Sequence, residues 1–267
     1  MTTITATTQA VHARKAGFFA DLLTVAGRAL RSLRRDPEAV IPALVIPIFF
    51  FVMNVGALQD FAERIPDLDY KAFQLPVAIL FAVTGNSRAI TVVTDIQSGY
   101  FDRLSVTPVN RLALLLGLMM ADFAVVVGLT LPVIVMGFVV GVGFESGPLG
   151  MLAFILLGGV WGLVFTGFPY AIALKTGNPA AVNISFLLFF PFLFMTTLFL
   201  PQEALTGWLA TVAGYNPVTY LLAAMRSLVS VGWEPDILLK GVLAIAGVGV
   251  VSITLALAAL RGRARRR

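Results

Sequence analysis

Apolar blocks long enough to cross a membrane constrain the fold of this chain more than any other feature. A membrane-spanning helix needs about 20 apolar residues, because each residue adds about 1.5 Å and the hydrocarbon core is about 30 Å thick. Six blocks meet this length: residues 40–58, 73–94, 112–141, 149–174, 181–200 and 239–260. Only 12% of the 267 residues are charged, and the mean hydropathy is +0.92. We therefore expect an all-α integral membrane protein with six transmembrane helices.

The distribution of lysine and arginine predicts how the chain is oriented. Loops on the cytoplasmic side of a membrane carry an excess of these residues. If both termini are cytoplasmic, all but four of the 19 basic residues lie inside, and the four are Arg64, Lys71, Arg226 and Lys240. We expect one transmembrane domain over residues 14–260 in the cell membrane. A disordered N-terminal tail at 1–13 and a basic cytoplasmic tail at 261–267 are expected to flank it.

Residues 14–36 are predicted to form an amphipathic helix in the inner headgroup layer. Apolar residues recur there at helical spacing and are opposed by six arginines and lysines, and Pro37 then redirects the chain into the first span. A solvated helix packed on the protein is the alternative. The net charge of +5 comes from basic residues that cluster beside apolar spans. This placement favours anionic lipid headgroups as partners, and we expect no nucleic acid.

Residues 201–238, on the outer side, are predicted to form a re-entrant helical hairpin. Their apolar pieces, 204–213 and 218–231, are each too short to cross a membrane. Pro201, Gly214 and Pro217 break the segment into short helices. Such helices can dip into the membrane and return when protein covers the turn.

A polar segment, DIQSGYFDRLSVTPVNR at residues 95–111, separates the second and third apolar blocks. Its apolar residues, Tyr100, Phe101 and Leu104, alternate with the charged pair Asp102 and Arg103. A short amphipathic helix with exposed aromatic residues is typical of a protein contact. An ordinary loop that rests on the lipid headgroups is the other interpretation.

Part of this segment resembles a motif of type-2 ABC exporter permeases, in particular those of the daunorubicin-resistance branch. The motif is a Glu-x-Gly followed by a short run and Leu-x-x-Thr-Pro-Val-x-Arg. The matching residues are Gly99, Leu104, Thr107, Pro108, Val109 and Arg111, with Asp102 at a position that is commonly acidic. Gln97 departs from the motif, because relatives usually carry glutamate there. A second stretch, NPVTYLLAAMR at residues 216–226, is similar to the piece that precedes the last span in this family.

The resemblance implies that residues 95–111 couple this chain to a separate ATPase subunit. The coupling residues would be Asp95, Gly99, Tyr100, Phe101, Asp102, Arg103, Leu104, Thr107, Pro108 and Arg111. The chain itself contains no Gly-Lys pair and therefore no phosphate-binding loop of the G-x-x-x-x-G-K-[ST] type. We expect it to be no enzyme by itself and to bind no cofactor, with ATP and Mg²⁺ on the partner.

The same resemblance implies a half-transporter. Two copies of this chain and two ATPase subunits would move an amphipathic drug-like or lipid-like substrate outward. Residues that could line its path are Phe186, Phe189, Phe190, Thr196 and Thr197, although helix packing is an equal interpretation of the phenylalanines. The residues of the re-entrant motif are Asn216, Pro217 and Arg226. Gly117, Gly128, Gly158, Gly159 and Gly162 are candidates for close approach between facing surfaces.

Two other classes of protein are weighed against an ABC subunit. A proton-coupled secondary transporter would use an acid inside the membrane, and Asp122 is the main candidate. We expect instead a structural role for Asp122, as a cap or a partner of Arg88 or Arg111, because one acid without a basic partner in the membrane makes a poor proton path. A membrane enzyme would need a nucleophile with a base or a metal cluster, yet the single histidine, His12, lies in the predicted tail. We expect no metal site, since two carboxylates such as Asp95 and Asp102 are too few ligands.

Overall fold

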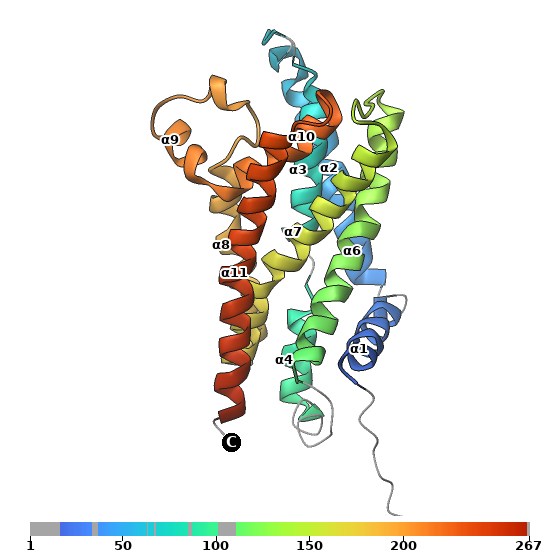
Figure 1. Ribbon diagram of the computed structural model, residues 1–267, viewed down its shortest axis with the longest axis vertical. Coiled ribbons are helices and arrows are strands. Elements are labelled where there is room, and N and C mark those ends of the chain that lie inside the picture. Colours follow the sequence, from blue (N-terminus) through green and yellow to red (C-terminus); the bar gives the residue numbers. More distant parts are fainter. Residues whose placement is uncertain are drawn as a thin grey trace, which may run out of the picture.

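The computed structural model describes residues 17–33, 37–62, 64–66, 68–84, 87–100 and 111–265. Within these ranges every regular element is a helix (Figure 1). The helices are α1 (Phe18–Leu33), α2 (Pro37–Ala62), α3 (Tyr70–Thr84), α4 (Ala89–Gln97), α6 (Arg111–Val139), α7 (Gly147–Thr176), α8 (Pro179–Phe194), the 3₁₀ helix Gln202–Ala204, α9 (Gly207–Tyr215), α10 (Pro217–Ser230) and α11 (Pro235–Arg265). The predicted tail at 1–13 lies outside the described residues.

Four of the described helices are long and apolar enough to cross a membrane. Their apolar ranges are Ile41–Ala62, Leu112–Val139, Gly147–Thr176 and Pro235–Arg263, and they agree with four of the predicted blocks. The remaining two blocks correspond to shorter apolar helices, Tyr70–Val83 and Pro179–Phe194. The six-span arrangement therefore stays a prediction.

The predicted second span, 73–94, is wrong as one continuous helix. Helix α3 ends at Thr84 and α4 begins at Ala89. The backbone N–H of Arg88 donates to Asp122 on α6, and the N–H of Ala89 donates to the Ser87 hydroxyl. These side-chain acceptors start a new helix, because the first N–H groups of a helix have no partner inside it.

Helix α1 packs along one end of α6, as Figure 1 shows. A Cβ atom at Gly117 would meet the Leu22 carbonyl oxygen at 2.8 Å, so the two helices are nearly in contact there. Ala26 and Ala29 of α1 are buried, whereas Phe19 is 76% exposed. The amphipathic helix predicted at 14–36 is thus present over Phe18–Leu33, with one side on protein and part of its apolar surface open.

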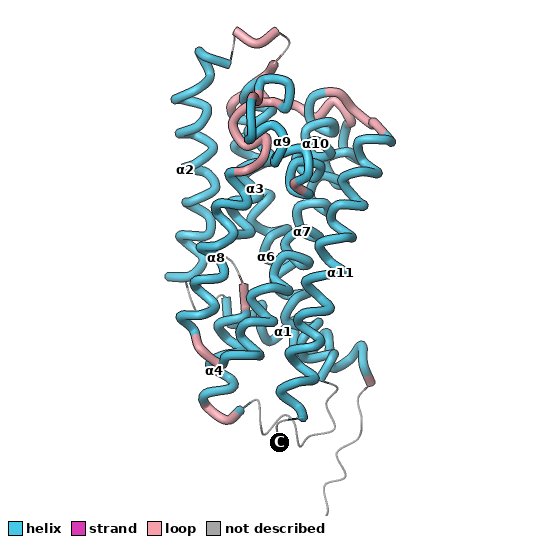
Figure 2. The backbone as a smooth tube through the Cα atoms, turned by 90° about the vertical axis from the view of Figure 1, so that its left-hand side faces the viewer, coloured by secondary structure: helices cyan, strands magenta, loops and turns pink. Residues whose placement is uncertain are grey.

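Helix α2 runs along one edge of the bundle in Figure 2. Only 11% of its apolar stretch is buried, and Ile41, Phe49 and Met53 are among its exposed side chains. An apolar helix open to this degree needs a non-aqueous surrounding, which a bilayer provides.

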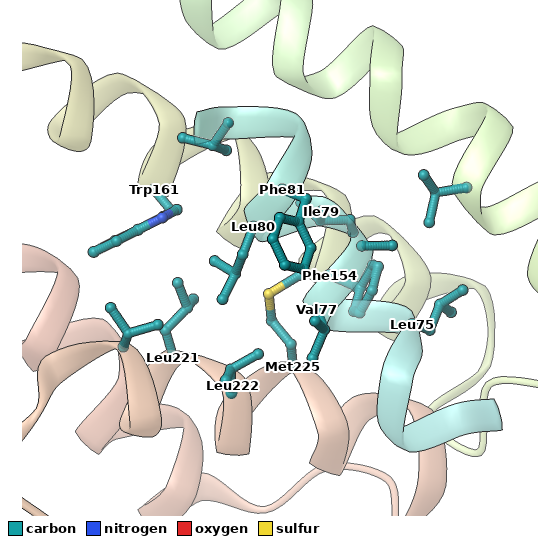
Figure 3. Packing of buried hydrophobic residues seen from close by; sticks show 14 of the residues in the cluster. Leu75, Val77, Ile79, Leu80, Phe81, Phe154, Trp161, Leu221, Leu222 and Met225 are labelled. Carbon is teal, nitrogen blue, oxygen red and sulfur yellow. The ribbon is translucent and has the colours of Figure 1, made fainter. Parts of the chain in front are cut away.

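The core lies where α3 and α10 pack against α7. Leu75, Val77, Ile79, Leu80 and Phe81 of α3 meet Phe154 and Trp161 of α7 and Leu221, Leu222 and Met225 of α10 (Figure 3). Although α10 has only 14 residues, most of its side chains are buried. By contrast, α9 buries only Ala213 and stands at the side of the bundle in Figure 1.

Glycines on α7 let neighbouring helices approach closely. An added Cβ would lie 2.7 Å from Phe123 at Gly159 and 2.9 Å from the Ser252 carbonyl carbon at Gly167. Four of the five glycines predicted for close approach thus meet other helices of the same chain; they are Gly117, Gly158, Gly159 and Gly162. The fifth, Gly128, has no described atom within 4 Å of an added Cβ.

We predict that Gly167→Ala destabilises the bundle, whereas Gly128→Ala does not. At Gly167 the obstacle is partly the backbone of α11, so helices must shift, at a cost of about 1–3 kcal/mol. At Gly128 the methyl group meets open space, and alanine favours the helix by up to ~1 kcal/mol. Denaturant unfolding in mixed micelles measures both changes. Equal effects of the two substitutions would contradict the close crossing of α7 and α11.

Candidate functional site

Three of the ten predicted coupling residues are described in full. Asp95 lies in the last turn of α4, and Gly99 and Tyr100 follow it. Phe101, Asp102, Arg103, Leu104, Thr107 and Pro108 lie outside the described residues, and Arg111 begins α6 with its side chain not described. The contact of these residues with an ATPase therefore stays a prediction.

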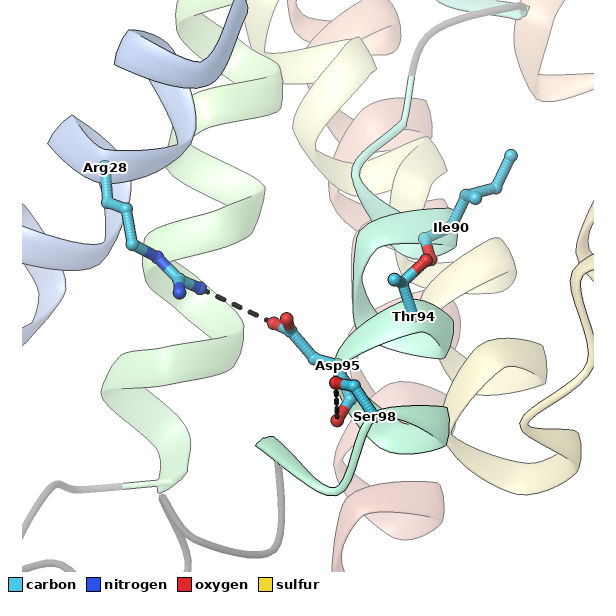
Figure 4. A network of polar contacts seen from close by, with 5 residues as sticks. All are labelled: Arg28, Ile90, Thr94, Asp95 and Ser98. Carbon is cyan, nitrogen blue, oxygen red and sulfur yellow. Dashed lines mark hydrogen bonds and ion pairs between the residues drawn. The ribbon is translucent and has the colours of Figure 1, made fainter.

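Arg28 of α1 joins the start of this segment. Its Nη2 lies 3.5 Å from Asp95 Oδ2 (Figure 4). Its guanidinium carbon lies 5.1 Å from the centre of the Tyr100 ring. Partial burial raises the pKa of the Asp95 carboxyl, while the Arg28 charge acts in the opposite direction. A partly exposed pair of this kind contributes only about 0–1 kcal/mol. The pair thus adds a weak contact between α1 and α4.

The C-terminal end of α4 turns at Gly99 and is tied to α7. Gly99 has a φ of +69°, a left-handed conformation that favours glycine and ends helices. The Gln97 side chain donates from Nε2 to the Gly177 carbonyl oxygen at 3.1 Å. A glutamate, which relatives usually carry here, has no N–H for this bond. Gln97 therefore makes a contact within the chain that a glutamate at this position could not make.

Asp122 anchors the other end of α4. Its Oδ1 accepts from the Arg88 backbone N–H at 3.0 Å, and its Oδ2 accepts from the Tyr170 hydroxyl at 2.8 Å. The side chain is 2% exposed. One carboxylate thus joins α4, α6 and α7, which agrees with the structural interpretation of Asp122 as a cap at Arg88.

Asn216 organises the end of the bundle that carries α9 and α10. Its Oδ1 accepts from the Val218 N–H and caps α10, which begins at Pro217. Its Nδ2 donates to the carbonyl oxygens of Phe192 and Met195 at 2.8 and 3.0 Å. The predicted fifth span, 181–200, ends as a helix at Phe194, and Asn216 satisfies carbonyls released at that point.

Arg226 also donates hydrogen bonds to the backbone that follows the end of α8. Its Nη2 and Nη1 donate to the carbonyl and hydroxyl oxygens of Thr197 at 2.7 and 2.9 Å, and its Nε donates to the Phe73 carbonyl at 3.0 Å. The guanidinium carbon also lies 3.3 Å from the centre of the Phe73 ring. Gln74 adds a bond from Nε2 to the Leu198 carbonyl at 3.1 Å. Three side chains therefore satisfy the backbone where α8 unwinds.

The residues predicted to line a substrate path lie beside this break. Phe189 is buried, with its ring centre 4.1 Å from that of Phe165, whereas Phe186 and Phe190 are half-buried. Thr196 and Thr197 are buried, and the Thr196 hydroxyl donates to the Leu193 carbonyl at 2.6 Å. Within the described chain these five side chains pack on protein, and their role in transport stays a prediction.

Sequence reasoning missed Tyr170, Gln74 and the end of a helix before Arg88. The sequence does carry a signal for the end of the helix before Arg88, because Gly85, Asn86 and Ser87 are residues typical of turns. The partners of Tyr170 and Gln74 are 48 and 124 positions away in the chain, so no local pattern indicates them. No group of three His, Cys, Asp or Glu side chains in the described ranges is arranged to hold a metal ion.

We predict that Asp122→Asn is tolerated and Asp122→Leu is not. Asparagine keeps an oxygen for the Arg88 N–H, and its amide can donate to the Tyr170 hydroxyl. Leucine leaves both buried groups without a partner, which costs about 1–3 kcal/mol for each group. Unfolding in micelles and substrate efflux from proteoliposomes measure the outcome. If asparagine abolishes efflux while the fold stays stable, Asp122 acts as a proton carrier instead.

We predict that Arg226→Lys destabilises the end of the bundle that carries α9 and α10 by about 2–4 kcal/mol. A lysine ammonium cannot keep the forked contacts with Thr197 and Phe73 together, and each bond to a charged group contributes about 1.5–3 kcal/mol. Arg64→Lys, at an exposed position, is the matched control and should change little. Hydrogen exchange at residues 195–200 should rise only in the first variant. Unchanged exchange would show that Arg226 does not hold this segment.

Comparison with known proteins places this architecture in a family. Residues 20–229 match the family model of the ABC-2 type transporter. The daunorubicin resistance ABC transporter permease protein DrrB1 of Streptomyces coeruleorubidus is 27% identical over 217 residues, which cover 77% of this chain and 74% of that protein. The probable doxorubicin resistance ABC transporter permease protein DrrC of Mycobacterium tuberculosis is 28% identical over 211 residues, covering 78% and 76%. A putative transport permease of Cyanophora paradoxa is 26% identical over 221 residues, covering 80% and 75%. The family match and the four long apolar helices show that this chain is a multi-pass membrane protein that belongs to the ABC-2 type transporter family.

Proposed function

We propose that this chain is the membrane subunit of an ATP-driven exporter of amphipathic drug-like or lipid-like molecules. The observation that carries the proposal is the match, over about three quarters of each chain, to permeases named for daunorubicin and doxorubicin resistance. Both drugs are amphipathic, and the exposed apolar surface of the bundle is compatible with entry of such molecules from lipid. A separate ATPase supplies the energy, with ATP and Mg²⁺ bound on that partner.

The proposed topology has six crossings with both termini in the cytoplasm. Helices α2, α6, α7 and α11 each cross alone; α3 and α4 together complete the second crossing, and α8 makes the fifth. Helix α3 alone is about 22 Å long, which is less than the ~30 Å core. The ends of α1, α4 and α11 lie together opposite α9 and α10 in Figures 1 and 2. Basic residues at that end include Arg28, Arg31, Lys175, Arg261 and Arg263, which the positive-inside rule places in the cytoplasm.

The outer ends complete this topology with a re-entrant hairpin of α9 and α10. Helix α10 is buried in the core, although it is too short to cross. The turn at Asn216 is bonded to carbonyls of α8 and is covered by protein, as non-helical backbone in a membrane requires.

In this proposal, residues 95–111 transmit force to the membrane helices through α4, which three side-chain contacts connect to its neighbours. Asp122 holds the start of the helix to α6 and α7, Gln97 holds its end to the turn after α7, and Arg28 holds it to α1. A push on residues 101–110 from an ATPase cleft would therefore move α4 together with these helices. Two copies of the chain, each with its ATPase, would open a route between them.

We predict that Phe101→Ala combined with Leu104→Ala uncouples transport from ATP turnover. Apolar anchors in a protein contact commonly contribute about 2 kcal/mol or more each, so efflux should fall at least roughly 30-fold. Ser105→Ala, in the same segment, is the control and should transport normally. The assay is ATP turnover and dye efflux with a co-purified ATPase in lipid nanodiscs and proteoliposomes. Normal efflux by the double variant would rule out this contact.

A further inference from the structure

Helices α7 and α11 line a groove near the end that carries the C terminus. They approach closely at Gly167, where an added Cβ would lie 2.8 Å from Ser252 Oγ, and the Ser252 hydroxyl donates to the Val164 carbonyl. One helical turn further on, the two helices line a cavity of about 680 Å³. This volume lies within the range of small-molecule sites, which is about 300–1,000 Å³.

The walls of the groove are apolar, and its mouth is basic. The apolar wall residues are Phe168, Ala171, Ile172, Leu255, Ala258 and Ala259. Lys175 and Arg263 lie one to two turns nearer the helix ends. The described lining includes no acidic side chain, so the two positive charges face the groove without a carboxylate partner in it.

Arg263 is held in place and still has donors to spare. Its Nη1 donates to the Leu174 carbonyl oxygen at 2.9 Å, which fixes the guanidinium against the end of α7. Its Nε is buried and has no acceptor in the part of the chain that the structure describes. A guanidinium carries five N–H donors in a planar fork that matches the oxygens of a phosphate.

We propose that this groove binds an anionic phospholipid, with the phosphate at Lys175 and Arg263 and an acyl chain along the apolar wall. The inference goes beyond the proposed function, because it requires neither an ATPase nor cargo. A lipid fits better than a soluble anion, since Leu255 and Ala258 are exposed at the level of the membrane-spanning helices.

Native mass spectrometry of the purified chain with added phosphatidylglycerol or phosphatidylcholine tests the proposal. Each basic residue near an anionic headgroup contributes a factor of about five in affinity, so wild type should prefer phosphatidylglycerol roughly 25-fold. Lys175→Gln or Arg263→Gln should each reduce the preference about five-fold. Arg261→Gln, which removes the same charge from an exposed position on the same helix end, should leave it nearly unchanged.

Ala258→Phe tests the apolar part of the groove without changing any charge. Its ring would fill the apolar part of the groove, so binding of phosphatidylglycerol should fall at least roughly ten-fold. Thr254→Phe is the matched control, because Thr254 is exposed one turn earlier on α11 and does not line the groove. This control should bind phosphatidylglycerol as wild type does.

Three results would overturn the proposal. The first is equal binding of the two lipids by wild type. The second is an effect of Arg261→Gln as large as that of Lys175→Gln. The third is a dimer that Ala258→Phe disrupts without weakening the binding of phosphatidylglycerol, since the groove would then be an interface between copies of the chain.

Discussion

Water is absent from the hydrocarbon core of a membrane, so each backbone N–H or C=O released where a helix breaks needs a partner from the protein. The described part of this chain has two breaks of this kind that side chains satisfy. At the first, between α3 and α4, Asp122 accepts from the Arg88 N–H. At the second, after α8, Asn216, Arg226 and Gln74 donate to the carbonyls of residues 192–198. These polar contacts add to the apolar packing between the helices.

The side chains at the two breaks make different contacts at the two ends of the bundle. At the end of the bundle that carries α1 and α4, Asp122 joins the start of α4 to α6 and α7. At the opposite end, Asn216 and Arg226 fix α10 in the core. Asp122 is buried and Arg226 is half-buried, and each makes hydrogen bonds to neighbouring helices or loops, which favours a structural role for both over a proton path.

Apolar length alone predicted the four long helices, because a run of more than 20 apolar residues has few other folds. The amphipathic pattern likewise predicted α1. The break before Arg88 was missed, since the apolar block from 73 to 94 continues through it and the acceptor, Asp122, is 34 positions away. Arg226 was predicted only as part of a motif, because its acceptor at Phe73 lies 153 positions earlier in the chain. Contacts between residues so far apart in the chain produce no local periodic pattern from which they could be predicted.

Site-directed cross-linking tests the assignment of the α4 end to the ATPase most directly, since the chain contains no cysteine of its own. Tyr100→Cys, next to the coupling segment, and Trp208→Cys, exposed on α9 at the opposite end, would each be treated with a short bifunctional maleimide in a co-purified complex. The proposed topology predicts a cross-link to the ATPase from position 100 and none from position 208. A cross-link from position 208 alone would place the ATPase at the other end and contradict it.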